Sequence, residues 1–137
     1  MPPISLLLVD DNPRFLQVLT RFLHVRFSDE VVIVGTAGGG MEALVQAQNL
    51  RPQVILLDLV MPGLGGLSAI PRLRSMMPDV GIIVLTVLDA KGYREAALAA
   101  GADDFVGKAS LYTDLFPAIQ RLTQGRRFIG ETPPAPA

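Results

Sequence analysis

The strongest constraint on the fold is an alternation of short, almost continuously apolar runs with longer segments whose apolar residues recur at helical spacing. Strands buried on both faces of a parallel sheet have this continuous apolar character. The intervening segments are long enough for the crossover helices that parallel strands require. The pattern therefore predicts a doubly wound α/β domain with a five-stranded parallel sheet covered by helices on both faces. The predicted strands are residues 4–9, 31–34, 54–57, 82–85 and, more weakly, 104–106.

Two prolines bear on the predicted helices. Pro13 precedes an apolar pattern at residues 15, 16, 19, 22 and 23, and it suits a first turn because an N–H there has no intrahelical partner. Pro71 falls inside the third helical segment, about residues 67–77, where a proline removes a backbone hydrogen bond. We therefore expect that helix to start late or to bend. Residues 115, 119 and 122 predict a last helix.

Length and composition narrow the class of protein. The chain has 137 residues, enough for one domain, and its 50% apolar and 18% charged residues exclude charge-driven disorder. A net charge of −1 gives no basic excess for binding nucleic acid or an anionic membrane. No apolar run approaches a membrane span, so we expect a soluble, cytoplasmic protein. We expect one domain at residues 1–124 and a Pro-rich tail or linker start at residues 125–137.

Side chains with chemical functions follow most of the predicted strands. Asp10 and Asp11 come directly after the first strand, Asp58 after the third, Thr86 after the fourth and Lys108 after the fifth. In a parallel α/β sheet the carboxyl ends of the strands form one rim, and ligands bind there. We therefore expect these side chains to converge on one site.

The available ligand types restrict the metal that such a site could hold. The chain has no cysteine and one histidine, His24, so a metal must be bound by oxygen, which suits Mg²⁺ or Mn²⁺. Taken singly, Asp10 and Asp11 could cap the following helix, and Asp58 could simply end a strand. An ionised Asp58 inside the apolar stretch VILLDLVMP is nevertheless costly without a cationic partner, which favours a functional site.

A carboxylate at this rim can also act as a nucleophile. Attack of Asp58 on a phosphoryl donor gives an aspartyl phosphate, whose charge a metal ion and the Lys108 ammonium would neutralise. The Thr86 hydroxyl could donate a hydrogen bond to the phosphoryl oxygens. Together these residues predict a magnesium-dependent phosphotransfer site.

Four stretches occur in the order typical of one protein family: LLLVDDNP, LLDLVMPGLGGL, LTV and GADDFVGKAS. On these motifs the chain, from about residue 4 to residue 123, resembles the receiver domain of bacterial two-component response regulators, the CheY-like fold. The resemblance implies a flavodoxin-like (βα)5 topology with strand order 2-1-3-4-5. It also implies a signalling switch, and not an enzyme, whose chemistry is limited to its own phosphorylation and dephosphorylation.

The resemblance assigns roles to the acidic residues. Asp58 matches the phosphoacceptor, which a sensor histidine kinase would phosphorylate. Asp10, Asp11 and Asp58 match the side chains that bind Mg²⁺, Asp10 mostly through water. The backbone carbonyl of Val60 matches a further metal ligand. The implied cofactor is therefore Mg²⁺, or Mn²⁺ in its place.

Other matched positions belong to the part of the receiver domain that changes shape on phosphorylation. Lys108 and Thr86 match the residues that contact the phosphoryl group. Thr86 and Phe105 match the switch pair, in which movement of the hydroxyl lets the aromatic ring turn inward. The resemblance thus implies a bistable face made of the fourth helix, the fifth strand and the fifth helix.

One departure from the family pattern points to a class within it. Ala109 follows Lys108 where a proline is common, and we expect a trans bond there because a cis bond without proline costs about 3 kcal/mol. Here the chain is similar to receivers of the NarL/FixJ class, which usually precede a helix-turn-helix DNA-binding domain. This implies either a regulator that controls transcription through an output domain absent from this sequence or a stand-alone receiver, and phosphorylation would change its partner or its homodimer interactions. From the net charge of −1 we expect that the receiver itself binds neither nucleic acid nor a membrane.

Other interpretations remain open. A degenerate receiver would bind partners without phosphorylation. A magnesium-dependent phosphatase with an aspartate nucleophile would also use Asp58 and Lys108, but DLVMP lacks the second acid expected two residues further on. The run Gly38-Gly39-Gly40 superficially resembles a phosphate-binding loop. It fits neither nucleotide-binding pattern and more simply lets the chain turn into the second helix.

Overall fold

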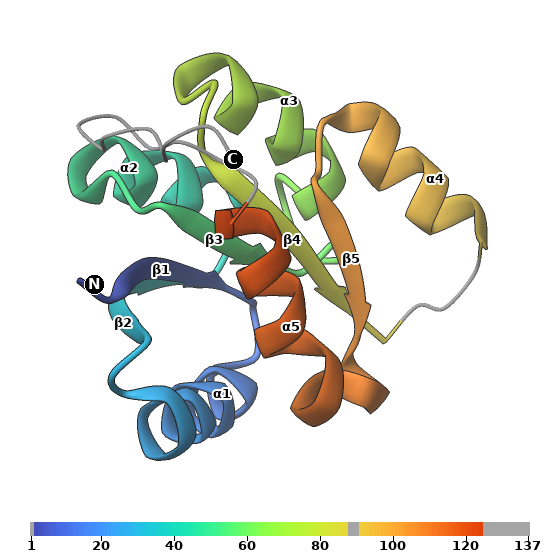
Figure 1. Cartoon of the computed structure of the whole chain (residues 1–137). Coiled ribbons are helices and arrows are strands. Elements are labelled where there is room, and N and C mark those ends of the chain that lie inside the picture. The colour runs from blue at the N-terminus through green and yellow to red at the C-terminus, as the bar shows by residue number, and fades with distance from the viewer. Residues whose placement is uncertain (1, 88–90, 125–137) are drawn as a thin grey trace, which may run out of the picture.

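Strands and helices alternate along the part of the chain that the computed structural model describes, residues 2–87 and 91–124 (Figure 1). The strands are β1 (Ile4–Val9), β2 (Val31–Ala37), β3 (Val54–Leu57), β4 (Gly81–Thr86) and β5 (Asp104–Gly107). The helices are α1 (Pro13–Phe27), α2 (Gly40–Leu50), α3 (Gly66–Met76), α4 (Lys91–Ala100) and α5 (Leu111–Gln124), with a 3-10 turn, η1 (Lys108–Ser110), before α5. The predicted tail at residues 125–137 lies outside the described residues.

The strands form one parallel sheet in the order β2-β1-β3-β4-β5, which confirms the predicted topology. β3 is central, and Leu57 lies opposite Val9 of β1 and Val84 of β4. β2, β4 and β5 extend beyond the predicted runs into small or polar residues such as Gly35 and Thr86. These residues were not predicted because the prediction used apolar side chains, whereas backbone pairing does not require them.

The prediction that every strand is buried on both faces is wrong for β2. This strand lies at the edge of the sheet and pairs only with β1. Val31 and Ala37 are buried at its two ends, whereas Val32 and Val34 between them are exposed. The helices therefore leave part of this edge strand uncovered, unlike β5 at the other edge, where Phe105 and Val106 are buried.

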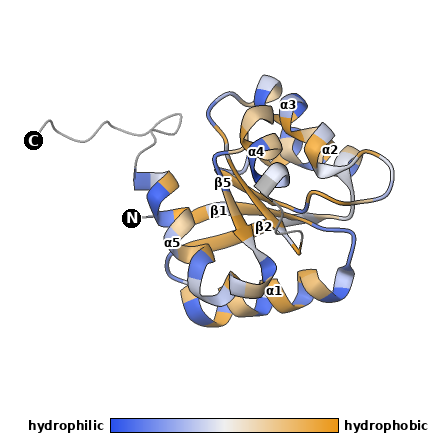
Figure 2. Ribbon diagram, turned by 90° about the vertical axis from the view of Figure 1, so that its right-hand side faces the viewer, coloured by the Kyte–Doolittle hydropathy of each residue, from blue (hydrophilic) through white to orange (hydrophobic). Residues whose placement is uncertain are grey.

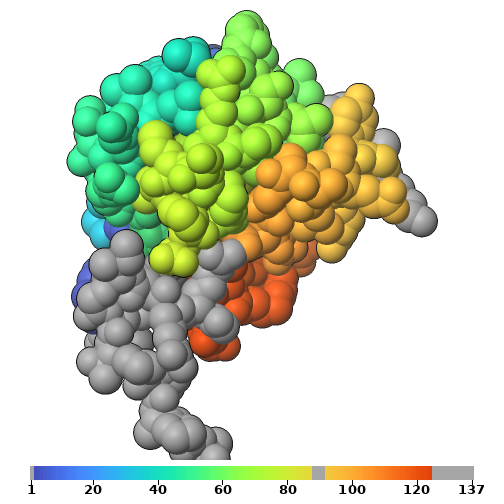
Figure 3. Space-filling view, turned by 90° about the horizontal axis from the view of Figure 1, so that it is seen from above, coloured from blue at the N-terminus to red at the C-terminus, as the bar shows by residue number. Residues whose placement is uncertain are grey.

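The sheet separates two apolar clusters. Successive side chains of a strand point to opposite faces. Leu7 of β1 belongs to the cluster beneath α2, α3 and α4, whereas Leu6 and Leu8 belong to the cluster beneath α1 and α5. Figure 2 shows the apolar strands between the two layers of helices, and Figure 3 shows α2, α3 and α4 side by side over one face. Burial on both faces therefore explains the continuous apolar runs of the central strands.

Helix α3 accommodates a proline in its interior. It begins at Gly66, so the first of the two expected outcomes, a late start, is wrong, whereas the alternative, a bend at Pro71, stays a prediction. Ile70 and Leu73, on either side of the proline, are fully buried, and their packing offsets the loss of one backbone hydrogen bond. Among the described residues, no helix is long and apolar enough to cross a membrane.

Candidate functional site

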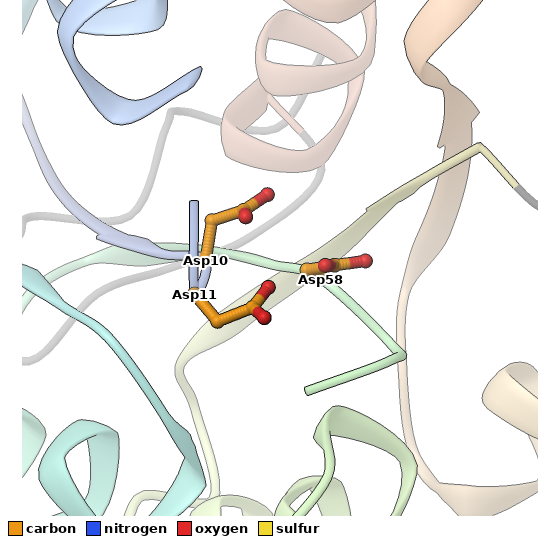
Figure 4. A group of neighbouring side chains, drawn as sticks. All are labelled: Asp10, Asp11 and Asp58. Atoms are coloured by element: carbon orange, nitrogen blue, oxygen red, sulfur yellow. The ribbon is translucent and has the colours of Figure 1, made fainter. Parts of the chain in front are cut away.

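The structure brings together aspartates that follow two different strands. β1 and β3 are neighbours, with Val9 opposite Leu57, so the residues after them leave the sheet side by side. The Asp58 N–H extends this pairing and donates a hydrogen bond of 2.9 Å to the Val9 carbonyl. Asp10, Asp11 and Asp58 each offer one carboxylate oxygen, and these oxygens lie within 4.8 Å of one another (Figure 4). The site is therefore an acidic cluster at the carboxyl ends of the central strands.

The carboxylates of the cluster differ in exposure. Asp10 and Asp58 keep only 2% and 6% of their surface accessible, whereas Asp11 is exposed. Burial raises the pKa of Asp58 above its ordinary value, and the Asp10 and Asp11 carboxylates add to the rise. The Lys108 ammonium and a hydrogen bond from the Val60 N–H act on this pKa in the opposite direction. The ionised form of Asp58 is thus held at a cost that additional positive charge would lower.

Lys108 supplies positive charge to the cluster. It follows β5 directly, and its Nζ lies 2.6 Å from Oδ2 of Asp10 and 3.8 Å from Oδ2 of Asp58. The same Nζ lies 4.1 Å from the centroid of the Phe15 ring in α1. No cis peptide bond occurs in the described residues, so the bond between Lys108 and Ala109 is trans, as expected. The ammonium group therefore lies between two buried carboxylates and an aromatic ring.

Thr86 and Phe105 lie on the two strands beyond β3. Thr86 ends β4, two positions after Val84, which pairs with Leu57, and it is buried at the same rim as the aspartates. Phe105 lies opposite Val84 and is buried in the cluster beneath α2, α3 and α4. Its ring centroid lies 6.0 Å from the guanidinium carbon of Arg94 in α4. The two residues thus occupy adjacent strands between the rim and α4.

The loop between β3 and α3 packs closely against the site. A Cβ atom at Gly66 would overlap the carbonyl oxygen of Asp58, and one at Gly40 would overlap the carbonyl oxygen of Leu64. The Gly40 N–H donates a hydrogen bond of 3.1 Å to that Leu64 oxygen, so Gly40, the last glycine of the run, serves backbone packing, whereas a Cβ at Gly39 would meet no atom within 4 Å. Val60 lies in this loop with an exposed side chain, and its N–H donates a 3.4 Å hydrogen bond to Oδ1 of Asp58.

Helix α1 is capped by Asn12, not by either preceding aspartate. The Asn12 side-chain oxygen accepts hydrogen bonds from the N–H groups of Arg14 and Phe15, at 3.0 and 3.2 Å, and a proline occupies the first turn as predicted. Oδ1 of Asp10 instead accepts a 2.9 Å hydrogen bond from the Asn12 N–H. The interpretation of the aspartates as simple caps is therefore wrong. Asn12 was not predicted, although an asparagine before a proline and a helical apolar pattern is a cap signal.

The donor set of the cluster fits a hard divalent cation. The carboxylates of Asp10, Asp11 and Asp58 face the single ammonium of Lys108, which leaves an excess of negative charge. The exposed Asp11 keeps the cluster open to solvent. Oxygen ligands without histidine or cysteine suit Mg²⁺ or Mn²⁺. Elsewhere in the described residues, no other group of acidic, histidine or cysteine side chains has this spacing.

Comparisons with known proteins agree with the fold and the motifs. The family model described as the response regulator receiver domain matches residues 6–120. The response regulator GacA of Pseudomonas protegens is 34% identical over 126 residues, which cover 92% of this chain and 58% of GacA, so the chain spans little more than half of that relative.

Solved structures give the same result. A two-component response regulator of the LuxR family from Aurantimonas sp. SI85-9A1 superposes with a TM-score of 0.84 at 28% identity, covering 91% of this chain and 88% of that one. The signal receiver domain of NarL from Mycobacterium tuberculosis superposes with a TM-score of 0.83 at 28% identity, covering 92% of this chain and 100% of that one. The predicted similarity to NarL-class receivers is confirmed.

Proposed function

The chain belongs to the response regulator receiver domain family, and on this premise we propose that it is a phosphorylation switch with Asp58 as the phosphoacceptor. Members of this family are phosphorylated on an aspartate in a Mg²⁺-dependent reaction. The observation that favours Asp58 is the difference between the two buried carboxylates. Asp10 has both oxygens engaged, by the Asn12 N–H and by Lys108 at 2.6 Å, whereas among the described residues Oδ2 of Asp58 has only the longer 3.8 Å contact with Lys108.

In the proposed reaction an Asp58 oxygen forms a bond to phosphorus as the bond between phosphorus and the donor breaks. With a phosphohistidine donor, the imidazole nitrogen leaves with the bonding electron pair and then takes up a proton. Lys108 pairs with the negative charge that arrives on Asp58. The Thr86 hydroxyl, at the same rim, donates a hydrogen bond to a phosphoryl oxygen.

The cluster would hold one Mg²⁺, or Mn²⁺, through Asp10, Asp11 and Asp58, with the Val60 backbone carbonyl as a further ligand. A bound divalent ion supplies the positive charge that offsets repulsion between these carboxylates and an incoming phosphoryl group. The buried aspartates fix the geometry, and the exposed Asp11 leaves the approach from solvent open.

The switch would act through Thr86 and Phe105. Phosphorylation adds a charge of about −1.5 to −2 at the rim, and this charge attracts the Thr86 hydroxyl. Phe105 lies on the neighbouring strand and near Arg94 of α4, so a change in its ring position would alter the surface of α4, β5 and α5. Phosphorylation would thereby change which partners this surface binds.

We further propose the partners of the switch. A sensor histidine kinase would donate the phosphoryl group, and the phosphorylated form would change its partners or form a homodimer. An output domain joined to this receiver would bind DNA and control transcription, whereas the receiver, with a net charge of −1, would not bind nucleic acid itself. The chain would work in the cytoplasm and catalyse nothing beyond its own phosphotransfer.

The first experiment is incubation with acetyl phosphate, with and without Mg²⁺, followed by intact mass. Asp58→Asn is the test variant, and Asp114→Asn, an exposed residue of α5, is the matched control. We expect the wild type and the control to gain one phosphoryl group only with Mg²⁺, and Asp58→Asn to gain none. Equal labelling of Asp58→Asn would show that another residue accepts the group. No labelling of the folded wild type would instead support the degenerate receiver.

A further inference from the structure

An aromatic ring contacts the cation of the proposed site. Nζ of Lys108 lies 4.1 Å from the centroid of the Phe15 ring, well inside the distance of about 6 Å over which a cation and an aromatic face attract each other. The side chain of Lys108 is only 16% exposed, so little water competes with the ring for the ammonium. Neither the acidic cluster nor the family motifs assign Phe15 a part in phosphotransfer.

The position of Phe15 is fixed by the site itself. Oδ1 of Asp10 accepts a hydrogen bond from the Asn12 N–H, and the Asn12 side chain accepts one from the Phe15 N–H. Phe15 also packs against the apolar cluster beneath α1 and α5. Together these contacts form a closed cycle of Asp10, Asn12, Phe15 and Lys108, because Lys108 touches Phe15 and pairs with Asp10 at 2.6 Å.

A flexible lysine needs such a restraint. Its four-carbon stem has many rotamers, and its ammonium must point at the carboxylates to act on them. The shorter contact of Lys108 is with Asp10, at 2.6 Å, and the contact with Asp58 is 3.8 Å. A ring against the ammonium limits its movement to the space beside the two acids and leaves its N–H donors directed to oxygen.

We propose that Phe15 is a positioning residue for phosphoryl transfer, whose ring face holds the Lys108 ammonium beside Asp58. This inference rests on the proposed function, because it assumes that Lys108 acts on the incoming phosphoryl group. Phe15 touches neither the phosphoryl donor nor Asp58 in this role, and its effect passes through Lys108 alone. The rate of phosphorylation should therefore depend on the electron density of the ring face, and not only on the volume of the side chain.

Substitutions separate this role from packing. Phe15→Leu removes the ring, and we expect phosphorylation by acetyl phosphate at saturating Mg²⁺ to slow by roughly fivefold. Phe15→Tyr keeps the ring and should restore the rate. Phe22→Leu is the matched control, since Phe22 lies in the same helix and packs against the same cluster, but its ring contacts Phe27 and Tyr112. It should lose comparable stability and keep the wild-type rate.

Fluorinated phenylalanines at position 15 provide the second readout. Successive fluorination withdraws electron density from the ring face at nearly constant shape, so the rate should fall stepwise from phenylalanine to the pentafluoro residue. In parallel, the ε-methylene protons of Lys108 should show an upfield ring-current shift in NMR spectra that Phe15→Leu abolishes.

The outcomes separate the inference from the proposed function. A rate that is flat across the fluorinated series, or a Phe22→Leu variant as slow as Phe15→Leu, would reduce Phe15 to a packing residue and overturn the inference while the wild type is still phosphorylated. A wild type that takes up no phosphoryl group would overturn the proposed function instead.

Discussion

Replacing Lys108 with methionine should destabilise the metal-free protein, because it leaves two buried carboxylates without their cation. Methionine keeps most of the apolar stem, so the change removes charge more than volume. The side chains of the pair are only 16% exposed at Lys108 and 3% exposed at Asp10. Removing one partner of a buried pair costs about 3 to 5 kcal/mol. Because Lys108 retains some exposure, we expect about 3 kcal/mol, a fall in Tm on the order of 10 °C.

The stability lost through Lys108→Met should depend on pH in a defined direction. Burial already raises the pKa of Asp58, and Lys108 opposes that rise, so its removal moves the pKa further up. A carboxyl group with a higher pKa in the folded state than in the unfolded state binds more protons when folded. Its contribution to stability is therefore full below the unfolded pKa and is lost as pH rises through the folded pKa. The cost of Lys108→Met should be small in mild acid and largest at neutral pH.

The assay is urea and thermal unfolding in mild acid and at neutral pH, each with a chelator or with Mg²⁺. Mg²⁺ should stabilise Lys108→Met at least as much as the wild type, because no ammonium competes with the ion for the carboxylates. Arg121→Met is the control, since Arg121 forms a 3.1 Å ion pair with Asp104 but is 65% exposed, and it should cost less than about 1 kcal/mol. A Lys108→Met cost equal to this control, or one that grows in acid, would refute the reasoning.

Two further substitutions test the site by stability. Asp58→Asn should raise the Tm of the metal-free protein at neutral pH, because it removes a carboxylate whose pKa is raised by burial. The gain in Tm should vanish in acid, where Asp58 is protonated in both the folded and the unfolded state. An unchanged or lower Tm in the presence of the chelator at neutral pH would contradict this. Gly66→Ala should cost about 3 kcal/mol, since its Cβ would overlap the Asp58 carbonyl oxygen. Gly92→Ala, in open space in α4, should be neutral or stabilising by up to about 1 kcal/mol in the same urea titration.

Much of the site could be predicted because topology alone determines it. Once the alternation of apolar runs and helices indicates a parallel sheet, every strand end lies on one rim. Asp10, Asp11, Asp58 and Lys108 are then neighbours whatever the details of packing. The phosphoacceptor role of Asp58 and the switch roles of Thr86 and Phe105 stay predictions, because they depend on a phosphorylated state.

Boundaries and caps were predicted less well. Apolar runs do not show where backbone pairing stops, so β2 continues through Gly35 to Ala37, beyond the predicted end. The exposure of β2 was also missed, because a run of apolar letters does not show which strand lies at the edge. Pro71 lies inside α3 because the burial of its neighbours outweighs one lost hydrogen bond.

The sequence by itself determined the order of elements, the acidic cluster and the type of metal that the cluster could hold, since these depend on pattern and ligand chemistry. Only the tertiary structure decided that Phe15 lies against Lys108 and that the two oxygens of Asp10 are engaged while Asp58 keeps the looser contact. Such contacts depend on how far α1 is rotated against the sheet. That rotation results from the packing of many side chains at once and leaves no local signal in the sequence.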